Sequence, residues 1–142
     1  MVITIGRECG CDGDEVARRL SEQYKIPHYT KKEIVALAKK KGIYDKYPLF
    51  FGEKTIDSMM TSVSDDFLSV RYTTPGKALA ELLDGQDCVV VGRASDFAFK
   101  DREDVVRVFL CGDIDGRVKR IAEKHGVSER KAKILVEETD AR

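Results

Sequence analysis

Hydrophobic positions along the chain follow two patterns that alternate with each other. Short apolar runs predict buried β-strands, and they lie at residues 2–5, 26–29, 88–91 and 105–110. Apolar residues at intervals of three and four predict amphipathic helices, and they occupy 55–64 and follow Gly13, Thr30, Pro75, Asp113 and Ser128. This alternation is typical of an α/β fold with a parallel sheet flanked by helices. With 142 residues, we expect one such domain over 1–142.

Polar residues and glycines mark the ends of these helices. Thr30 and Glu33 have the spacing of a capping box, and Gly42 follows the last apolar position of the same helix. Residues 43–54 are rich in aromatic side chains but show no period, so we expect a loop there. The run at 105–110 resembles the run at 88–91, so both strands are expected to be buried on both faces.

The first strand runs directly into a glycine-spaced turn that ends at Gly13. A strand, a glycine loop and a helix start in this order place free backbone N–H groups and a positive helix end at one point, which favours phosphate binding. The turn lacks the lysine and the hydroxyl of G-x-x-x-x-G-K-[ST], and Glu8 occupies the place of the first glycine of a dinucleotide loop. An ordinary strand-to-helix turn is the alternative interpretation.

Arg93 follows the apolar run at 88–91. Ligands of parallel α/β folds bind beyond the carboxyl ends of the strands, and a guanidinium there is suited to bidentate phosphate binding. The alternative is a surface arginine paired with Asp96 or Asp87. Arg117 and Arg120 lie on the helix after the fourth strand and share one face of it, where they indicate either a solvated face or a second set of phosphate ligands.

Charge and composition argue against several other classes of protein. Twenty-five basic and 25 acidic residues give a formal net charge of zero, which argues against binding of a nucleic acid polymer. No apolar run is long enough to span a membrane and no signal peptide is visible, so we expect a cytoplasmic protein. The four cysteines are expected to be reduced thiols, and Cys9-x-Cys11 is too tight for a zinc knuckle, so no metal-ligand cluster is expected.

Three segments together resemble the cytidylate kinase-like family, a branch of the nucleoside-monophosphate kinases within the P-loop class. They are ITIGRECGCDG at 3–13, VVVGRASD at 89–96, and the stretch from VFL at 108–110 to RVKR at 117–120. IPHYTKKE at 26–33 also resembles the second strand and helix of the family. The spacing between these segments fits the family, and the match spans essentially the whole chain. The combination is more specific than any one segment.

The resemblance implies a P-loop NTPase-like kinase core with the first strand central. It also implies phosphoryl transfer from ATP, with Mg²⁺, to a nucleoside monophosphate such as CMP. The residues implied to bind the nucleotide phosphates are Arg7, Gly10, Cys11, Asp12, Gly13 and Asp14. Those implied to bind the acceptor are Arg93, Asp96, Asp140 and Arg142, and those implied to neutralise the transferred group are Arg93, Arg117 and Arg120, the last two in a lid region.

The sequence also departs from the family pattern. Cys11 and Asp12 stand where this branch often has serine and glycine, and Thr30 stands where the family usually has aspartate. Family members typically continue beyond the position of Arg142 through another strand and helix, so we expect a fragment, a shortened chain or a reduced relative without catalysis.

Two alternatives to a kinase therefore stay open. One is a nucleotide-binding or regulatory domain without turnover, which the loop side chains favour. The other is an interaction or homo-oligomerisation module that would use the aromatic segment 44–51 and the helix carrying Met59 and Met60. Nucleotides are the expected small-molecule partners in the first two interpretations.

Overall fold

The computed structural model describes residues 1–51, 76–92 and 95–141. In chain order the elements are β1 (Val2–Arg7), α1 (Gly13–Tyr24), β2 (His28–Tyr29), α2 (Lys31–Lys40), the 3₁₀ turn η1 (Tyr44–Lys46), α3 (Pro48–Phe51), a helix over 76–82, β3 (Cys88–Val91), α5 (Ser95–Ala98), β4 (Val105–Leu110), α6 (Ile114–His125) and α7 (Glu129–Asp140). The predicted α/β order is confirmed.

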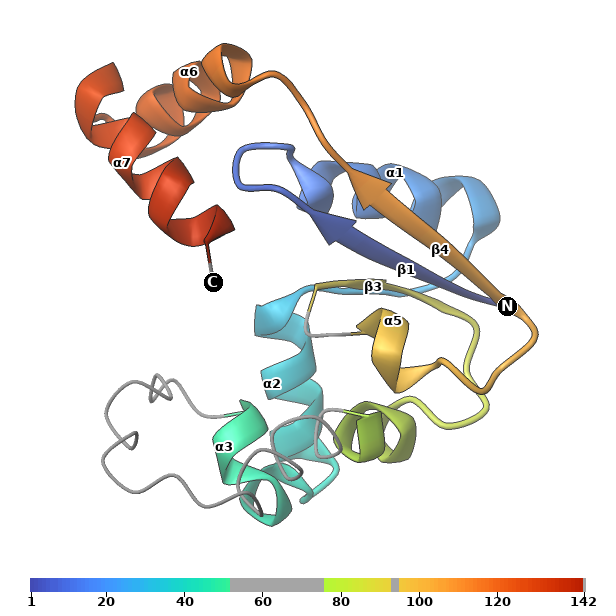
Figure 1. Cartoon of the computed structure of the whole chain (residues 1–142). Coiled ribbons are helices and arrows are strands. Elements are labelled where there is room, and N and C mark those ends of the chain that lie inside the picture. Colours follow the sequence, from blue (N-terminus) through green and yellow to red (C-terminus); the bar gives the residue numbers. More distant parts are fainter. Residues whose placement is uncertain (52–75, 93–94, 142) are drawn as a thin grey trace.

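The four described strands form one parallel sheet in the order β2-β3-β1-β4. β1 is central, with Ile5 opposite Val91 of β3 and Val108 of β4. Because all the strands run the same way, their carboxyl ends meet at one edge of the sheet, where the arrowheads of β1 and β4 point in Figure 1. The loop after β1 starts from the middle of that edge.

Helices cover the two faces of the sheet and give it two apolar cores (Figure 1). On one face α1 packs against Ile3, Ile5, Val89 and Val91 with the side that the sequence predicted, which consists of Val16, Ala17 and Leu20. On the other face Val2 and Val90 share a core with residues of α2, α3 and the helix over 76–82, including the fully buried Leu82 at the end of that helix and Leu83 directly after it. Alternate residues of β1 therefore serve opposite cores.

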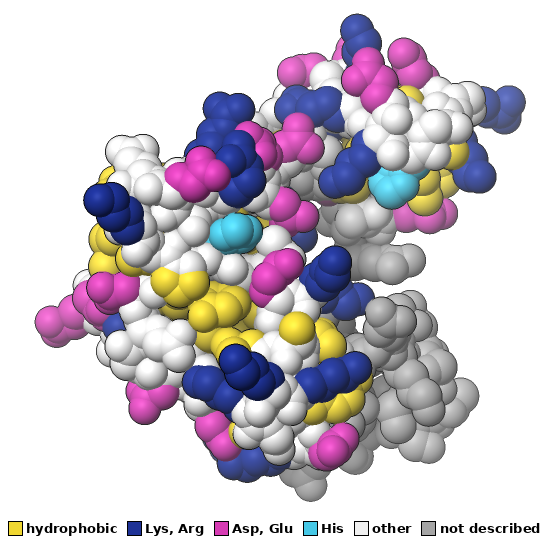
Figure 2. Space-filling view, turned by 180° about the vertical axis from the view of Figure 1, so that it is seen from behind, with side chains coloured by type: hydrophobic (Ala, Val, Ile, Leu, Met, Phe, Trp, Pro, Cys, Tyr) yellow, Lys and Arg dark blue, Asp and Glu magenta, His cyan; other side chains and the backbone are white. Residues whose placement is uncertain are grey.

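α6 and α7 form a helical pair beyond the carboxyl edge of the sheet (Figure 1). Their apolar faces build a cluster of their own from Val118, Ile121, Ala122, Ala132 and Val136. In the space-filling view of Figure 2 this pair stands off from the body of the molecule, and a hollow separates the two on the face drawn there. None of the described helices has the length and apolar character needed to cross a membrane.

Two expectations for the fold are wrong. Part of the segment expected to be a loop, 43–54, contains η1 and α3, because the rings of Tyr44 and Tyr47 pack against Phe51 and hold the chain in short helical turns. β4 is not buried on both faces: as an edge strand with β1 as its neighbour, it leaves Val106 50% and Phe109 68% exposed. The helix expected over 55–64 lies outside the described residues.

Candidate functional site

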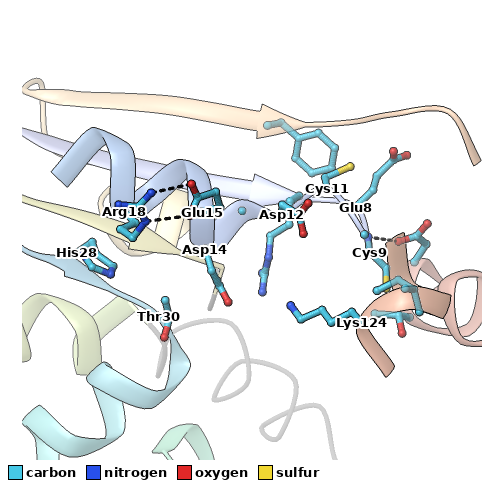
Figure 3. A pocket seen from close by; sticks show the side chains of 17 residues that line it. Glu8, Cys9, Cys11, Asp12, Asp14, Glu15, Arg18, His28, Thr30 and Lys124 are labelled. Carbon is cyan, nitrogen blue, oxygen red and sulfur yellow. Dashed lines mark hydrogen bonds and ion pairs between the residues drawn. The ribbon is translucent and has the colours of Figure 1, made fainter. Parts of the chain in front are cut away.

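A cavity of about 990 Å³ opens at the carboxyl edge of the sheet. One wall is the loop from Arg7 to Gly13 together with the first turns of α1, and the opposite wall is formed by α6 and α7. His28 and Thr30, at the end of β2, close a third side. In Figure 3, Asp14 and Lys124 point into this space from opposite walls. Its volume lies at the upper end of the range typical of ligand sites.

The loop holds two residues in the left-handed conformation, Gly10 at φ 87° and Asp12 at φ 50°. Gly10 must lack a side chain, because a Cβ there would lie 2.8 Å from the carbonyl oxygen of Arg117. Asp12 precedes α1, yet its carboxylate accepts no hydrogen bond from the helix. The first N–H groups of α1 therefore carry no side-chain cap, which is the condition for anion binding at a helix start.

Arg117 ties the helical pair to this loop. It is only 7% exposed, and its Nε donates to the carbonyl oxygen of Gly112 at 2.9 Å. Its Nη1 donates to Asp140 Oδ2 at 2.5 Å and to the carbonyl oxygen of Cys9 at 3.3 Å. Glu8 Oε2 lies 3.4 Å from the same guanidinium. The guanidinium thus binds the loop, the start of α6 and the end of α7 together.

Asp140 completes this network from the end of α7. Its Oδ1 accepts a hydrogen bond from the backbone N–H of Cys9 at 2.8 Å, while Glu8 Oε2 accepts one from the N–H of Gly112 at 3.1 Å. The Cys9 N–H first, and then Arg117, lower the pKa of Asp140 below its ordinary value because both favour the carboxylate. We call these residues, Glu8, Cys9, Gly112, Arg117 and Asp140, the loop latch.

The structure brings many of the expected site residues together. Those that line the cavity are Arg7, Gly10, Cys11, Asp12, Gly13, Asp14 and Asp140. Arg117 instead lies behind the loop in the latch, Arg120 is exposed and donates to the Gly116 carbonyl oxygen of its own helix, and Asp96 is exposed on α5. Arg93 and Arg142 lie outside the described residues.

Several cavity residues were not among those expected. Lys124 lies seven positions after Arg117, so the helical period puts both on one face of α6, and this signal was available in the sequence. Glu15 accepts hydrogen bonds from Arg18 and Arg19. These arginines lie three and four residues after Glu15 on the same helix, a spacing that predicts the contact from the sequence. These bonds, that from Arg18 above all, lower the pKa of Glu15 to about 2. His28 lines the cavity without a sequence signal of its own.

The cysteines near the loop are free thiols. Burial raises the pKa of Cys11 above its ordinary value, and the nearby Arg117 opposes this only in part. A thiol with a raised pKa stays protonated at neutral pH, so Cys11 is a poor nucleophile and a poor metal ligand.

Carboxylates outnumber permanent cations in the lining of the cavity. The carboxylates are Glu8, Asp12, Asp14, Glu15 and Asp140, and the cations are Arg7, Arg18 and Lys124. In residues 1–51, 76–92 and 95–141, no three metal-ligating side chains group together. Mg²⁺ is ordinarily held by one or two carboxylates together with substrate phosphates, so Asp14 and Asp12 fit this ion as an adjunct to a phosphate ligand.

The sequence model of the cytidylate kinase-like family matches residues 2–142. A search of curated proteins finds none that matches. Among solved structures, the chain is similar to an uncharacterized protein from Eubacterium ventriosum, with 29% identity and a TM-score of 0.67, over 99% of this chain and 74% of that one.

Two more distant structures are similar in fold. One is a gluconokinase from Sinorhizobium meliloti, with 17% identity and a TM-score of 0.54 over 97% of this chain and 73% of that one. The other is TT1252 from Thermus thermophilus, with 13% identity and a TM-score of 0.53 over 97% and 78%. Together with the parallel sheet, these likenesses confirm the P-loop NTPase-like α/β fold that the sequence predicted.

Proposed function

The chain belongs to the cytidylate kinase-like family, and from this premise we propose that it transfers a phosphoryl group from ATP to a nucleoside monophosphate such as CMP. Membership supports a kinase-type function in general. The acceptor and the individual roles of the residues are part of the proposal.

One observation carries the proposal: the loop after the central strand presents the uncapped start of α1 to a large cavity. Backbone N–H groups and the positive end of a helix bind phosphate without any lysine in the loop. Phosphoryl transfer needs positioning and charge neutralisation more than covalent chemistry from the protein. The loop supplies the positioning, and Arg7 and Lys124 place cations on opposite walls of the cavity.

Asp14 and Asp12 are the residues that would hold Mg²⁺ in this cavity, since they place carboxylates beside the start of α1. When bound with the nucleotide, the ion would neutralise phosphate charge. Without it, these carboxylates repel a polyphosphate. Binding of ATP is therefore expected to depend on Mg²⁺.

The test is release of ADP from ATP and Mg²⁺, with and without each of a panel of nucleoside monophosphates. Gly10→Ala should lower the rate at least tenfold, because its Cβ would collide with the Arg117 carbonyl oxygen and shift the loop. Gly42→Ala is the matched control, since Gly42 has a similar φ of 72° but nothing within 4 Å of an added Cβ. Absence of acceptor-dependent ADP with every monophosphate, or equal rates in the two variants, would overturn the proposal.

Binding without turnover is the second candidate, and the loop side chains favour it. Asp14 follows Gly13 directly, where the full phosphate-loop motif carries its lysine after the last glycine. If the missing lysine abolished turnover, ATP with Mg²⁺ would raise the melting temperature of the protein while no ADP appeared. A thermal-shift series beside the ADP assay separates the two candidates.

A further inference from the structure

We propose that Arg7 takes the place of the missing phosphate-loop lysine and binds the phosphate groups of the nucleotide in the cavity. This inference rests on the proposed function, because it assigns a residue within the same site. The resemblance to the family implies that Arg7 is one of six loop residues that bind nucleotide phosphate, and we add that its guanidinium does the work of the missing lysine. The role follows from the space that the structure reserves for its side chain.

Arg7 is the last residue of β1, and its side chain crosses from the central strand to the end of β3. Its Cδ lies 3.1 Å from the position that a Cβ on Gly13 would take. Its Nη1 lies 2.2 Å from the position that a Cβ on Gly92 would take. The guanidinium thus occupies the space between the start of α1 and the tip of β3.

Gly13 is informative because its backbone does not demand glycine. It is the first residue of α1 and does not have a positive φ. A Cβ there would lie 3.1 Å from Cδ and 3.3 Å from Cγ of Arg7, closer than ordinary contact, so the stem of the arginine would have to shift by a few tenths of an ångström. Glycine at this position therefore lets the arginine lie undisplaced beside the uncapped helix start, where a phosphate would be bound.

Arg7 is also available for a ligand. It lines the cavity, and it makes no hydrogen bond or ion pair with the residues that the structure describes. Arg18 is bound to Glu15 and Glu22, and Arg117 is bound within the loop latch. Lys124 is likewise unpaired within the described part of the chain, but its side chain does not lie against glycines as that of Arg7 does. A guanidinium held without a protein partner is suited to bidentate phosphate binding.

The first experiment compares binding of ATP with Mg²⁺ and of inorganic tripolyphosphate to the wild type, Arg7→Ala and Arg7→Lys by calorimetry. Loss of a charge-assisted contact should weaken both ligands by about 10- to 100-fold in Arg7→Ala. Arg7→Lys should recover part of this affinity because lysine restores the positive charge but not the bidentate hydrogen-bond geometry of the guanidinium. Unchanged affinity in Arg7→Ala, or weaker binding of ATP with no change for tripolyphosphate, would overturn the inference.

The second experiment moves the guanidinium without removing it. Gly92→Ala puts a Cβ where Arg7 Nη1 now lies, and the far end of that flexible side chain must shift. Gly85→Ala is the matched control, because Gly85 has φ 68° against 65° at Gly92 and nothing within 4 Å of an added Cβ. Gly92→Ala should weaken tripolyphosphate binding when it is made in the wild type, but it should cause no further loss of binding when it is made in Arg7→Ala. Gly85→Ala should leave tripolyphosphate binding unchanged in both backgrounds.

The same penalty for Gly92→Ala in both backgrounds would show that Gly92 does not act through Arg7, and would overturn the inference. The failure of the proposed function looks different: the wild type would release no acceptor-dependent ADP, whatever the effect of Arg7 on tripolyphosphate. Circular dichroism melts of each variant exclude loss of folding as the cause of weaker binding.

Discussion

The two walls of the cavity are held in place by different forces. α1 is fixed to the sheet by apolar contacts, with Ala17 fully buried against a cluster that contains Ile5 and Val91. The α6–α7 pair has an apolar cluster of its own, against which Cys9 of the loop packs, and it is further tied to the loop by the polar contacts of Arg117 and Asp140. The loop after β1 therefore lies between a wall held by apolar burial and a wall held largely by charged hydrogen-bond partners.

This difference indicates how the site can respond to conditions. Apolar burial is non-directional and depends little on pH or salt. A network of ionised hydrogen-bond partners is directional and depends on the protonation of its carboxylates. We therefore expect α1 to keep its place under conditions that release the helical pair, and the loop backbone at Cys9 to follow the pair.

The largest effect should come from the apolar wall. Ile5→Ala removes a fully buried side chain beneath α1 and should lower the free energy of unfolding by about 2–5 kcal/mol. Val106→Ala, on the exposed side of the edge strand, should change it by less than about 0.5 kcal/mol. Denaturant titration measures both, and equal costs would contradict the assignment of the core.

A smaller and more local effect is expected from the polar wall. Arg117→Ala leaves Asp140 and Glu8 without their cation, and because both carboxylates are partly exposed we expect a cost of about 1–3 kcal/mol. Hydrogen exchange should speed up at 8–12 and across α6 and α7, while β1 and β3 stay protected. A uniform increase over the whole sheet would mean that the latch is not a separate contact.

The pH dependence of the latch follows from Asp140. Its pKa is lowered in the folded state, so it stabilises the fold above its ordinary pKa of 3.8, and this stabilisation is lost as the pH falls through the folded value. Asp140→Asn removes the charge at every pH. The difference in melting temperature between wild type and Asp140→Asn should therefore be present at pH 6 and shrink toward pH 3. A difference that is constant with pH would show that the carboxylate charge does not contribute.

The smallest effect on stability is expected at Arg120. Its side chain is exposed, and its Nε donates to the carbonyl oxygen of Gly116 in the same helix at 3.3 Å, so Arg120→Ala should cost less than about 0.5 kcal/mol. If Arg120 neutralises the transferred phosphoryl group, as the resemblance implies, the same variant loses turnover while its stability is unchanged. ADP release measured beside a thermal melt decides this. Unchanged ADP release would remove Arg120 from the catalytic group, and a large loss of stability would contradict its placement on the surface.

Local patterns were enough to predict much of the fold. The bounds Cys88–Val91 and Val105–Leu110 could be read from apolar runs. The caps Asp113 and Ser128 could be read because a cap bonds within its own first turn, here to the N–H groups of Gly116 and Lys131. The position of β4 at the edge of the sheet could not be predicted from the sequence, since an apolar run does not show how many neighbouring strands a strand has.

Which residues line the cavity could be predicted where this depends on the chain order and not where it depends on distant contacts. The loop from Gly10 to Asp14 follows the central strand, so its place at the cavity follows from topology. The burial of Arg117 depends on Cys9, which is 108 positions away, and on Asp140, 23 positions away. Helical spacing shows which face Arg117 occupies but not which residues that face meets.

The proposed function requires the loop amides at the start of α1 to bind nucleotide phosphate. A titration of the ¹⁵N-labelled protein with ATP and Mg²⁺, followed by ¹H–¹⁵N correlation spectra, tests it most directly. We predict saturable shifts of the N–H signals of residues 10–14, reproduced by tripolyphosphate and absent with adenosine. Loop signals that stay in place at a saturating concentration of ATP, or shifts confined to other parts of the chain, would show that the loop does not bind the phosphates.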